Sequence, residues 1–554
     1  MHTKRSLTII AFLSIFTLAQ MSLLAQPLKQ TPGFTRQDTL RGTLNPERTG
    51  WDVLHYSITV APDYAQKLIS GTNEIQFKVV KDFQKMQIDL QQPMEIVSVK
   101  WNNAVIPFER EGNVFHLNFP RTLREGKIET ILITFKGNPR VAQRPPWDGG
   151  WIFAKDRMGR PWMSVACQGL GASVWYPCKD HQSDEPNKGA LLNITVPDTL
   201  MAVANGRRKE NIKAPKGFTT YSWEVINPIN NYNIIPYIGK YVNWTEIYKG
   251  EKGDLDCSYW VLDYELDKAK EQFKQVPKML KSFEYWFGPY PFYEDGYKLV
   301  QSPHLGMEHQ SAVAYGNRFQ NGYLGRDLSG TGWGLKWDFI IVHESGHEWF
   351  ANNITSFDIA DMWVHEGFTN YSETLFTTSE YGVEAGNDYV TGTRKLISND
   401  IPIIGPYGVN QEGSGDMYYK GGNLLHTIRQ LIGNDEKLRQ ILRGLNQKYY
   451  HSITSSKEVE AYFSEHSGID LSSIFDQYLR TTSIPVLQYK FTGDAIQYRW
   501  TNCLEGFKMK VRVELGNKMV WLEPGKEWKN LSIGTDSQSL KPDRNFYIKV
   551  AEVK

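Results

Sequence analysis

The stretch "HESGHEWF", residues 343–350, decides how the rest of the chain is interpreted. Two histidines stand four residues apart, with a glutamate directly after the first. On an α-helix, residues i and i+4 lie on one face, so His343 and His347 can direct both imidazole rings at one ion. Glu344 lies between them and can reach a water molecule bound to that ion. The surrounding segment "DFIIVHESGHEWFANNI" (338–354) has apolar residues at helical spacing, which predicts a buried helix.

A catalytic zinc ion requires a third protein ligand and one open position for water. The segment "DMWVHEGFTNYSETLF" (361–376) predicts a second helix, and it holds Glu366 with 18 residues between it and His347. His365 is a rival ligand, but neighbours on a helix point about 100° apart, so both cannot face one ion. The alternative interpretation is that the motif forms a solvated polar face. The apolar neighbours of the motif argue against this, because they predict a buried helix, and buried unpaired charge is costly. We therefore predict that His343, His347 and Glu366 hold one zinc ion per chain.

The composition of the chain excludes some classes of partner. Its 554 residues are 41% hydrophobic and 13% aromatic, which is enough to build several domains with real cores. Lys and Arg number 62 against 61 Asp and Glu, so the net charge is only +1. A protein that neutralises phosphates needs a basic excess, and we therefore expect no nucleic-acid partner.

The first 25 residues have the pattern of a secretory signal peptide. Lys4 and Arg5 precede an apolar run at 7–24 that is broken by polar residues, and Ala25 is a small residue at the cleavage point. Cleavage after Ala19 is an alternative. A membrane anchor is another, because the run is near the length that spans a bilayer, although its polar interruptions favour cleavage. We expect a secreted or periplasmic protein whose mature chain has no stable membrane span.

Cysteine usage says little about the fold. Four cysteines in a chain of this length are too few for a disulfide scaffold, and their spacing does not match a thiolate zinc site. Cys167 and Cys178 are close in sequence, and an oxidising compartment permits a bridge between them. Buried free thiols are the alternative, and both interpretations stay open. The four are Cys167, Cys178, Cys257 and Cys503.

Periodicity divides the chain into a multidomain α+β arrangement. Residues 1–25 are followed by an N-terminal linker (26–48) and an antiparallel β-sandwich-like domain (49–245). Residues 246–483 form a mostly helical catalytic domain that carries the HExxH element, and 484–554 form a small β-domain. Helices are expected at 262–288, with an interruption at Pro277, and at 416–432 and 434–449; strands are expected at 53–60, 73–80, 128–135 and 508–515.

Five ordered motifs resemble the aminopeptidase N and leukotriene hydrolase group of zinc gluzincins. The first is "HESGH" with 18 intervening residues before the Glu of "VHEGF". The resemblance covers roughly 49–490 and implies that the catalytic domain is thermolysin-like. The other motifs are "FEYWFGPYPF" (283–292), similar to the family's Phe-Gly-x-Tyr-Pro segment; "LGMEHQ" (305–310), similar to Gly-x-Met-Glu-Asn; "YYKGGNLL" (418–425), similar to the Tyr-Glu-Lys-Gly helix start; and "ACQGLGASVWYPCKD" (166–180), similar to a glutamine strand followed by Pro-Cys-x-Asp.

The resemblance implies a zinc aminopeptidase that hydrolyses the N-terminal bond of peptides with a free N-terminus. Glu344 would be the general base that deprotonates a zinc-activated water and later protonates the leaving amine. Tyr418 would donate a hydrogen bond to the oxyanion, with its neighbour Tyr419 the less favoured candidate. Glu308 would bind the substrate α-amine, and Gln168 would line the same amine pocket. The alternatives are a zinc endopeptidase and a catalytically silent peptide-binding protein. The presence of Glu344 and Tyr418 argues against the silent protein.

The chain also departs from the family's pattern. His309 and His365 stand where asparagine is usual, and Ala166 and Ser173 replace polar or arginine residues. We expect the two added histidines to titrate near neutrality and to alter the pH response of the amine pocket. Residues 484–554 predict strands in place of the large C-terminal helical domain of many relatives. We therefore expect that domain to be absent and the site to be more open, or closed by a partner subunit in a homo-oligomer.

Overall fold

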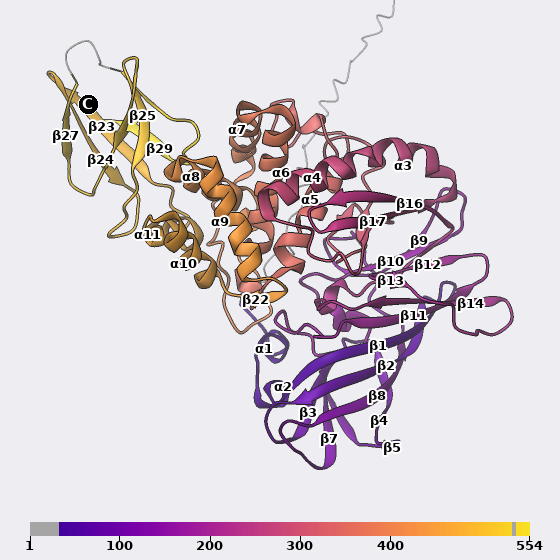
Figure 1. The fold of residues 1–554 in the computed structure, drawn as a ribbon. Coiled ribbons are helices and arrows are strands. Elements are labelled where there is room, and N and C mark those ends of the chain that lie inside the picture. The colour runs from indigo at the N-terminus through magenta and orange to yellow at the C-terminus, as the bar shows by residue number, and fades with distance from the viewer. Residues whose placement is uncertain (1–32, 534–538, 554) are drawn as a thin grey trace, which may run out of the picture.

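The computed structural model describes residues 33–533 and 539–553, and a mostly helical region lies between two β-rich regions (Figure 1). The expected signal peptide, residues 1–25, lies outside the described residues. Among those that are described, no helix combines the length and the apolar character needed to cross a bilayer.

Residues 35–49 are folded, which corrects the predicted linker at 26–48. They form α1 (Arg36–Gly42) and α2 (Pro46–Thr49), and each helix begins at a side-chain cap. Arg48 anchors the segment, because its side chain is fully buried and pairs with the Asp89 carboxylate at 2.8 Å. A buried arginine needs a partner of this kind, so the segment belongs to the N-terminal β-region.

Three sheets build the N-terminal region. The pairing of β1 with β11 is parallel, while β1 and β2 are antiparallel, so the region is not the purely antiparallel sandwich predicted. Alternate residues of β1 are buried in one continuous apolar core. The largest sheet has the order β13 (Arg207–Arg208), β14 (Phe218–Val225), β11 (Ala190–Pro197), β1 (Trp51–Asp63), β2 (Leu68–Val79), β8 (Ile128–Gly137), β4 (Glu95–Trp101), β5 (Ala104–Val105); the second has β3 (Phe83–Asp89), β7 (Val114–Leu123), β6 (Phe108–Glu111); the third has β12 (Met201–Val203), β15 (Tyr237–Gly239), β10 (Pro161–Ala166), β9 (Gly150–Lys155).

The catalytic region starts with a five-stranded sheet, and its first strand crosses the predicted boundary at 245. The strands β16 and β17 pair along their whole length, from Tyr241 opposite Leu262 to Gly250 opposite Gly253, so β16 cannot be divided between two domains. We therefore place the boundary near residue 240. The sheet order is β16 (Tyr241–Gly250), β17 (Gly253–Leu262), β18 (Tyr297–Gln301), β20 (Val313–Tyr315), β19 (Gly306–Met307).

Helices form most of the rest of the catalytic region. The break predicted at Pro277 falls slightly earlier, at 273–275. Pro277 itself lies in the first turn of α4, where a backbone N–H has no partner within the helix, so the missing N–H of proline costs no hydrogen bond. The helices expected at 416–432 and 434–449 are α8 and α9. The helices are α3 (Leu266–Gln272), α4 (Val276–Phe287), α5 (Phe339–Gly346), α6 (Trp363–Tyr381), α7 (Val383–Gly392), α8 (Tyr419–Ile432), α9 (Asp435–Lys448), α10 (Ser456–Ser467) and α11 (Ser472–Arg480).

Helix α5 is shorter than the predicted 338–354. It ends at Gly346, His347 caps it, and the following turn (348–352) contains Ala351 with φ of 145°. The chain then enters strand β21 (Ile354–Ser356), which pairs in parallel with β22 (Ser452–Thr454). This long-range pairing forces the chain out of the helix, which local periodicity cannot reveal.

The C-terminal β-region packs on the helices rather than standing apart (Figure 1). Tyr478 of α11 donates a hydrogen bond to the carbonyl of Tyr547 at 2.6 Å, and a ring nitrogen of His426 on α8 lies 3.0 Å from the Asn545 Oδ1. Its buried apolar residues join the core of the catalytic region. One sheet has the order β27 (Lys529–Ser532), β24 (Ala495–Thr501), β23 (Val486–Thr492), β29 (Lys549–Glu552), and the other β26 (Lys518–Leu522), β25 (Val511–Leu515), β28 (Leu540–Pro542).

Candidate active site

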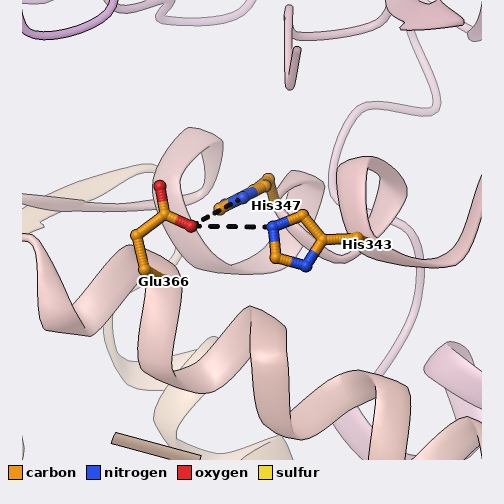
Figure 2. A group of neighbouring side chains, drawn as sticks. All are labelled: His343, His347 and Glu366. Atoms are coloured by element: carbon orange, nitrogen blue, oxygen red, sulfur yellow. Dashed lines mark ion pairs between the residues drawn. The ribbon is translucent and has the colours of Figure 1, made fainter. Parts of the chain in front are cut away.

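Helices α5 and α6 bring the three predicted zinc ligands together (Figure 2). The Glu366 Oε2 lies 3.3 Å from the Nε2 of His347 and 3.7 Å from the Nε2 of His343. One ligand atom from each residue lies within 4.8 Å of the others, and all three side chains are buried. This spacing suits three ligands around a single ion.

Hydrogen bonds orient both imidazole rings toward the centre of this group. The Nδ1 of His343 lies 2.7 Å from the Glu373 Oε1, and the Nδ1 of His347 lies 3.0 Å from the Phe350 carbonyl oxygen. A ring that donates from Nδ1 leaves Nε2 free to bind a metal. The Glu366 Oε2 is buried and accepts no hydrogen bond from the described residues. Two nitrogens and one carboxylate oxygen are a donor set that zinc takes, so these residues fit the ion.

The electrostatics of the group also favour a cation. Burial lowers the pKa of His343, but the Glu366 and Glu373 carboxylates outweigh burial and raise that pKa well above its usual value. Burial raises the pKa of Glu366, but His347 and His343 outweigh it and hold that pKa below its ordinary range. The carboxylates therefore favour positive charge at the two imidazole rings. A divalent ion would supply that charge while the rings stay unprotonated.

Glu344 points from α5 into the cavity beside this group. Burial raises its pKa to about 7, although the two histidines act in the opposite direction. Gly306 makes room for the carboxylate, because a Cβ at this position would lie 2.5 Å from the Glu344 Oε1. A carboxyl with a pKa near neutrality is suited to accept and return a proton.

Glu344, Glu308 and His347 form a second group with metal-ligand spacing. The Glu308 Oε1, however, already accepts hydrogen bonds from the Tyr232 hydroxyl at 2.8 Å and from the Gln168 Nε2 at 2.7 Å. An oxygen with two donors is a poor metal ligand. The orphaned oxygen of Glu366 therefore makes the first group the better metal site.

Glu308 and Gln168 lie together, although 140 positions separate them in the sequence. Glu308 follows the edge strand β19, and Gln168 follows β10 of the N-terminal region. The Gln168 Nε2 also lies 3.3 Å from the Glu366 Oε1, so it joins the amine pocket to the metal group. Sequence reasoning missed Tyr232, which carries no motif and reaches Glu308 from the N-terminal region.

Tyr418 lies directly before α8 and faces the metal group. Its ring stacks on that of His343, with centroids 6.0 Å apart and planes 21° apart. Burial and the nearby Glu366 carboxylate raise the pKa of Tyr418 well above 10, so its hydroxyl remains a proton donor. Tyr419 also lines the cavity.

One open cavity contains all the predicted site residues. Its wall also contains Glu412, which sequence reasoning missed; burial, together with Glu366 and Glu308, raises the pKa of Glu412 to about 7. The predicted residues in the wall are Gln168, Glu308, His343, Glu344, His347, Glu366 and Tyr418.

The expectation that His309 and His365 titrate near neutrality is wrong. Both are fully buried, and burial lowers the pKa of His365 to about 3 and that of His309 well below its usual value. The Nε2 of His365 accepts the backbone N–H of Ser356 at 2.8 Å, so the ring has a structural contact away from the cavity. The open question about Cys167 and Cys178 is also settled, because both are free and buried.

Glu373 tests whether the ring orientation of His343 matters. Its carboxylate also accepts hydrogen bonds from Tyr389 at 2.6 Å and Asn370 at 3.1 Å. We expect Glu373→Gln to weaken zinc binding by roughly 10- to 100-fold, because an outer partner of this kind fixes the tautomer and the basicity of its ligand. Titration with a competing chelator measures the affinity, and an unchanged value would show that Glu373 only fills space.

The fold and the three clustered side chains resemble those of a zinc metallopeptidase of the gluzincin type. Residues 271–478 match the model of the Peptidase family M1 domain.

Curated relatives cover much of the chain at low identity. Aminopeptidase B of Homo sapiens is 23% identical over 68% of this chain and 58% of its own length. Leukotriene A-4 hydrolase of Xenopus laevis is 21% identical over 81% of this chain and 74% of its own length. The chain thus spans about three fifths of aminopeptidase B.

Solved structures support the same fold. A two-domain M1 zinc metallopeptidase variant bound to L-tryptophan has a TM-score of 0.66 at 20% identity. An M1 zinc metallopeptidase variant from Deinococcus radiodurans, bound to a Tyr-Ser-Ala substrate, has a TM-score of 0.67 at 19% identity. Each match covers 79% of this chain and 96% of the solved chain. The predicted combination of a β-region and a helical catalytic region is therefore confirmed.

Proposed function

We propose that the protein is a zinc aminopeptidase that hydrolyses the N-terminal bond of peptides with a free N-terminus. One observation carries the proposal: the metal group and the Glu308–Gln168 pair share one cavity, linked by the contact of Gln168 with Glu366. A buried carboxylate beside the metal group is suited to an ammonium group. It holds the start of the peptide at a fixed distance from the site of hydrolysis.

The side chains in the cavity supply the remaining steps. Zinc bound to His343, His347 and Glu366 would polarise a carbonyl and lower the pKa of a water molecule. Glu344 takes the proton from the attacking water and returns it to the leaving amine. Tyr418 donates a hydrogen bond to the carbonyl oxygen as negative charge develops there, while Glu308 holds the α-ammonium.

Matched peptides with free and acetylated N-termini test the proposal. We expect hydrolysis of the free peptides alone, because acetylation removes the charge that Glu308 binds and adds bulk at the amine pocket. Loss of activity with a chelator, and its return with zinc, is the control for metal dependence. Equal cleavage of both peptides would instead support a zinc endopeptidase. A zinc-loaded protein that cleaves neither peptide would be a silent binding protein.

We further propose that the protein is exported and acts as a secreted or periplasmic enzyme. The basic Lys4 and Arg5, the apolar run at 7–24 and the small Ala25 support this. N-terminal sequencing of the mature protein tests it, and we expect the sequence to begin at Gln26. A start at Gln20 would move the cleavage site, and an intact N-terminus in the membrane fraction would indicate an anchor.

A further inference from the structure

A second cavity lies between the N-terminal β-region and the sheet of the catalytic region. Strands β13 and β14 line one side of it, and β16, β17 and β18 line the other. Its volume is about 200 Å³, and a cavity of roughly 150 Å³ already accepts a benzene molecule. None of its described lining residues belongs to the wall of the active-site cavity. The second cavity is therefore a separate place where a small molecule fits.

Lys298 is a buried lysine in the wall of this cavity. It lies on β18 between Tyr297 and Leu299, whose side chains join the core of the catalytic region. Side chains alternate along a strand, so Lys298 points to the opposite face of the sheet, toward the N-terminal region. Its side chain is only 3% exposed. A lysine is rarely buried to this degree without a charged partner.

The Lys298 ammonium has no anionic partner at close range. Among the described residues, it donates to the backbone carbonyl of Gly206, and no carboxylate forms an ion pair with it. An ammonium carries three N–H donors, so one carbonyl leaves it poorly satisfied. Burial lowers the pKa of Lys298 to about 7, although the charge of Asp295 acts in the opposite direction. An anion bound in the cavity would supply the missing partner.

The carboxylates of the second cavity are already engaged elsewhere. Asp295 accepts the backbone N–H of Ile226 at 3.0 Å and the side-chain amide of Asn227 at 2.8 Å. Asp256 forms an ion pair with Arg207. These contacts hold both carboxylates away from the Lys298 ammonium, so the vacant position beside it is open to a ligand.

The charges of the second cavity favour a ligand with one negative charge. The described residues that line it carry three basic side chains and two carboxylates. With Lys298 protonated, the excess is a single positive charge, which a monoanion balances. A dianion such as phosphate would leave negative charge beside the two carboxylates, where burial makes it costly. The charged residues are Arg207, Arg208, Lys298, Asp256 and Asp295.

Two tryptophan rings give the second cavity an apolar wall. Trp223 and Trp260 meet edge to face, with ring centroids 5.7 Å apart. Both are fixed by their indole N–H groups, since Trp223 donates to the Ala202 carbonyl at 3.1 Å and Trp260 to the Ser258 hydroxyl at 3.3 Å. The Lys298 Nζ lies 5.6 Å from the centroid of the Trp223 ring. A ligand whose anionic group contacts Lys298 therefore has its apolar part next to the tryptophans.

We propose that the second cavity is a binding site for a small monocarboxylate with an apolar or aromatic body. The carboxylate accepts hydrogen bonds from the Lys298 ammonium, and the body packs against Trp223 and Trp260. This charge-assisted contact gives the site its selectivity for an acid over the neutral molecule of the same shape. The inference concerns binding alone and does not rest on the proposed peptide hydrolysis.

Calorimetric titration of the zinc-loaded protein with phenylacetate tests this site. Saturating acetohydroxamate occupies the zinc ion, so carboxylate binding there does not contribute. We expect phenylacetate to bind at least about 10-fold more tightly than phenylacetamide, which has nearly the same shape and no charge. Lys298→Met keeps an unbranched side chain without the charge, and it should weaken phenylacetate binding by roughly 10- to 100-fold. Lys240→Met is the matched control: this lysine is exposed and outside the cavity, so affinity should not change.

The outcomes decide each part of the inference. Equal affinity of the wild-type protein for phenylacetate and phenylacetamide would overturn it, and this comparison needs no variant to fold. Equal phenylacetate affinity of the wild-type and a folded Lys298→Met protein would also overturn it. Tighter binding of inorganic phosphate than of phenylacetate would contradict the choice of a monocarboxylate. Trp223→Leu should weaken phenylacetate binding more than acetate binding, and an equal loss for both would exclude the apolar wall. A protein that binds phenylacetate in this way but hydrolyses no peptide would contradict the proposed function alone.

Discussion

Glu344→Gln is expected to lower kcat/KM by about three to four orders of magnitude while the protein keeps one zinc ion per chain. A general base contributes on this scale, and the loss corresponds to roughly 4 to 5.5 kcal/mol of activation free energy. Glutamine has nearly the same shape as glutamate, so Gly306 still accommodates it. The amide, however, cannot take a proton from water.

Measuring zinc content together with activity shows whether Glu344 is a general base or a metal ligand. His343, His347 and Glu366 are untouched by the substitution, and Glu373 still orients His343. A variant that loses activity and zinc together would show that Glu344 is a ligand, as the second group of Glu308, Glu344 and His347 allows. A variant with more than a tenth of the wild-type activity would show that another residue is the base.

Glu348 provides a matched control on the turn that follows α5. It is also a buried glutamate, and burial raises its pKa to about 8. Its Oε1 accepts the N–H of Ser311 at 2.8 Å, which the amide of Glu348→Gln can preserve, and it does not line the cavity. We expect this variant to keep activity within a few-fold of the wild-type value.

The parts of the site that could be predicted are those set by local geometry or by an ordered motif. Helical spacing alone places His343 and His347 on one face, and the angle between neighbours separates Glu366 from His365. The structure brings these side chains into one cavity, with His365 directed elsewhere. For Glu308 and Tyr418 the resemblance to a family was needed, because neither has a spacing that carries chemistry by itself.

The residues that were missed reach the site through tertiary structure. Tyr232 contacts Glu308 only because the N-terminal region packs on the edge strand β19. Glu412 enters the cavity because its loop is closed by contacts at Gly413 and tied to α1. Glu373 is different: it lies two helical turns after Glu366 on α6, and this spacing is a local signal that could have identified it.

The N-terminal helices α1 and α2 show that the fold, like the site, depends on tertiary contacts that the sequence pattern does not reveal. Thr35 and Asp38 form a capping box, and Asn45 precedes a proline, so both helix starts are visible in the sequence. Their short length favours a linker, because isolated helices of this size are unstable in water. The buried pair of Arg48 with Asp89 stabilises them, and no local pattern predicts that pair.

Glu366→Ala is expected to lower zinc affinity by more than about 100-fold, a larger effect than the loss of an outer hydrogen-bond partner. Among the described residues, the Glu366 carboxylate is the one that contacts the Nε2 atoms of both His343 and His347, and the substitution removes it. Two imidazoles then remain, which is fewer than the three protein ligands of a catalytic zinc site. The protein as purified should contain little zinc, and added zinc should restore activity only at high concentration.

His365→Ala is the control that makes this result specific. Its ring is buried next to Glu366 in the sequence but accepts a hydrogen bond from Ser356, away from the metal group. Removing it leaves a cavity and an unsatisfied N–H, so we expect a loss of roughly 2 to 4 kcal/mol in the free energy of unfolding. Zinc content should stay at one ion per chain under conditions in which the variant is folded. If His365→Ala instead releases the metal and Glu366→Ala keeps it, the third ligand is His365, and helix α6 must be rotated from the orientation that places Glu366 between the two histidines.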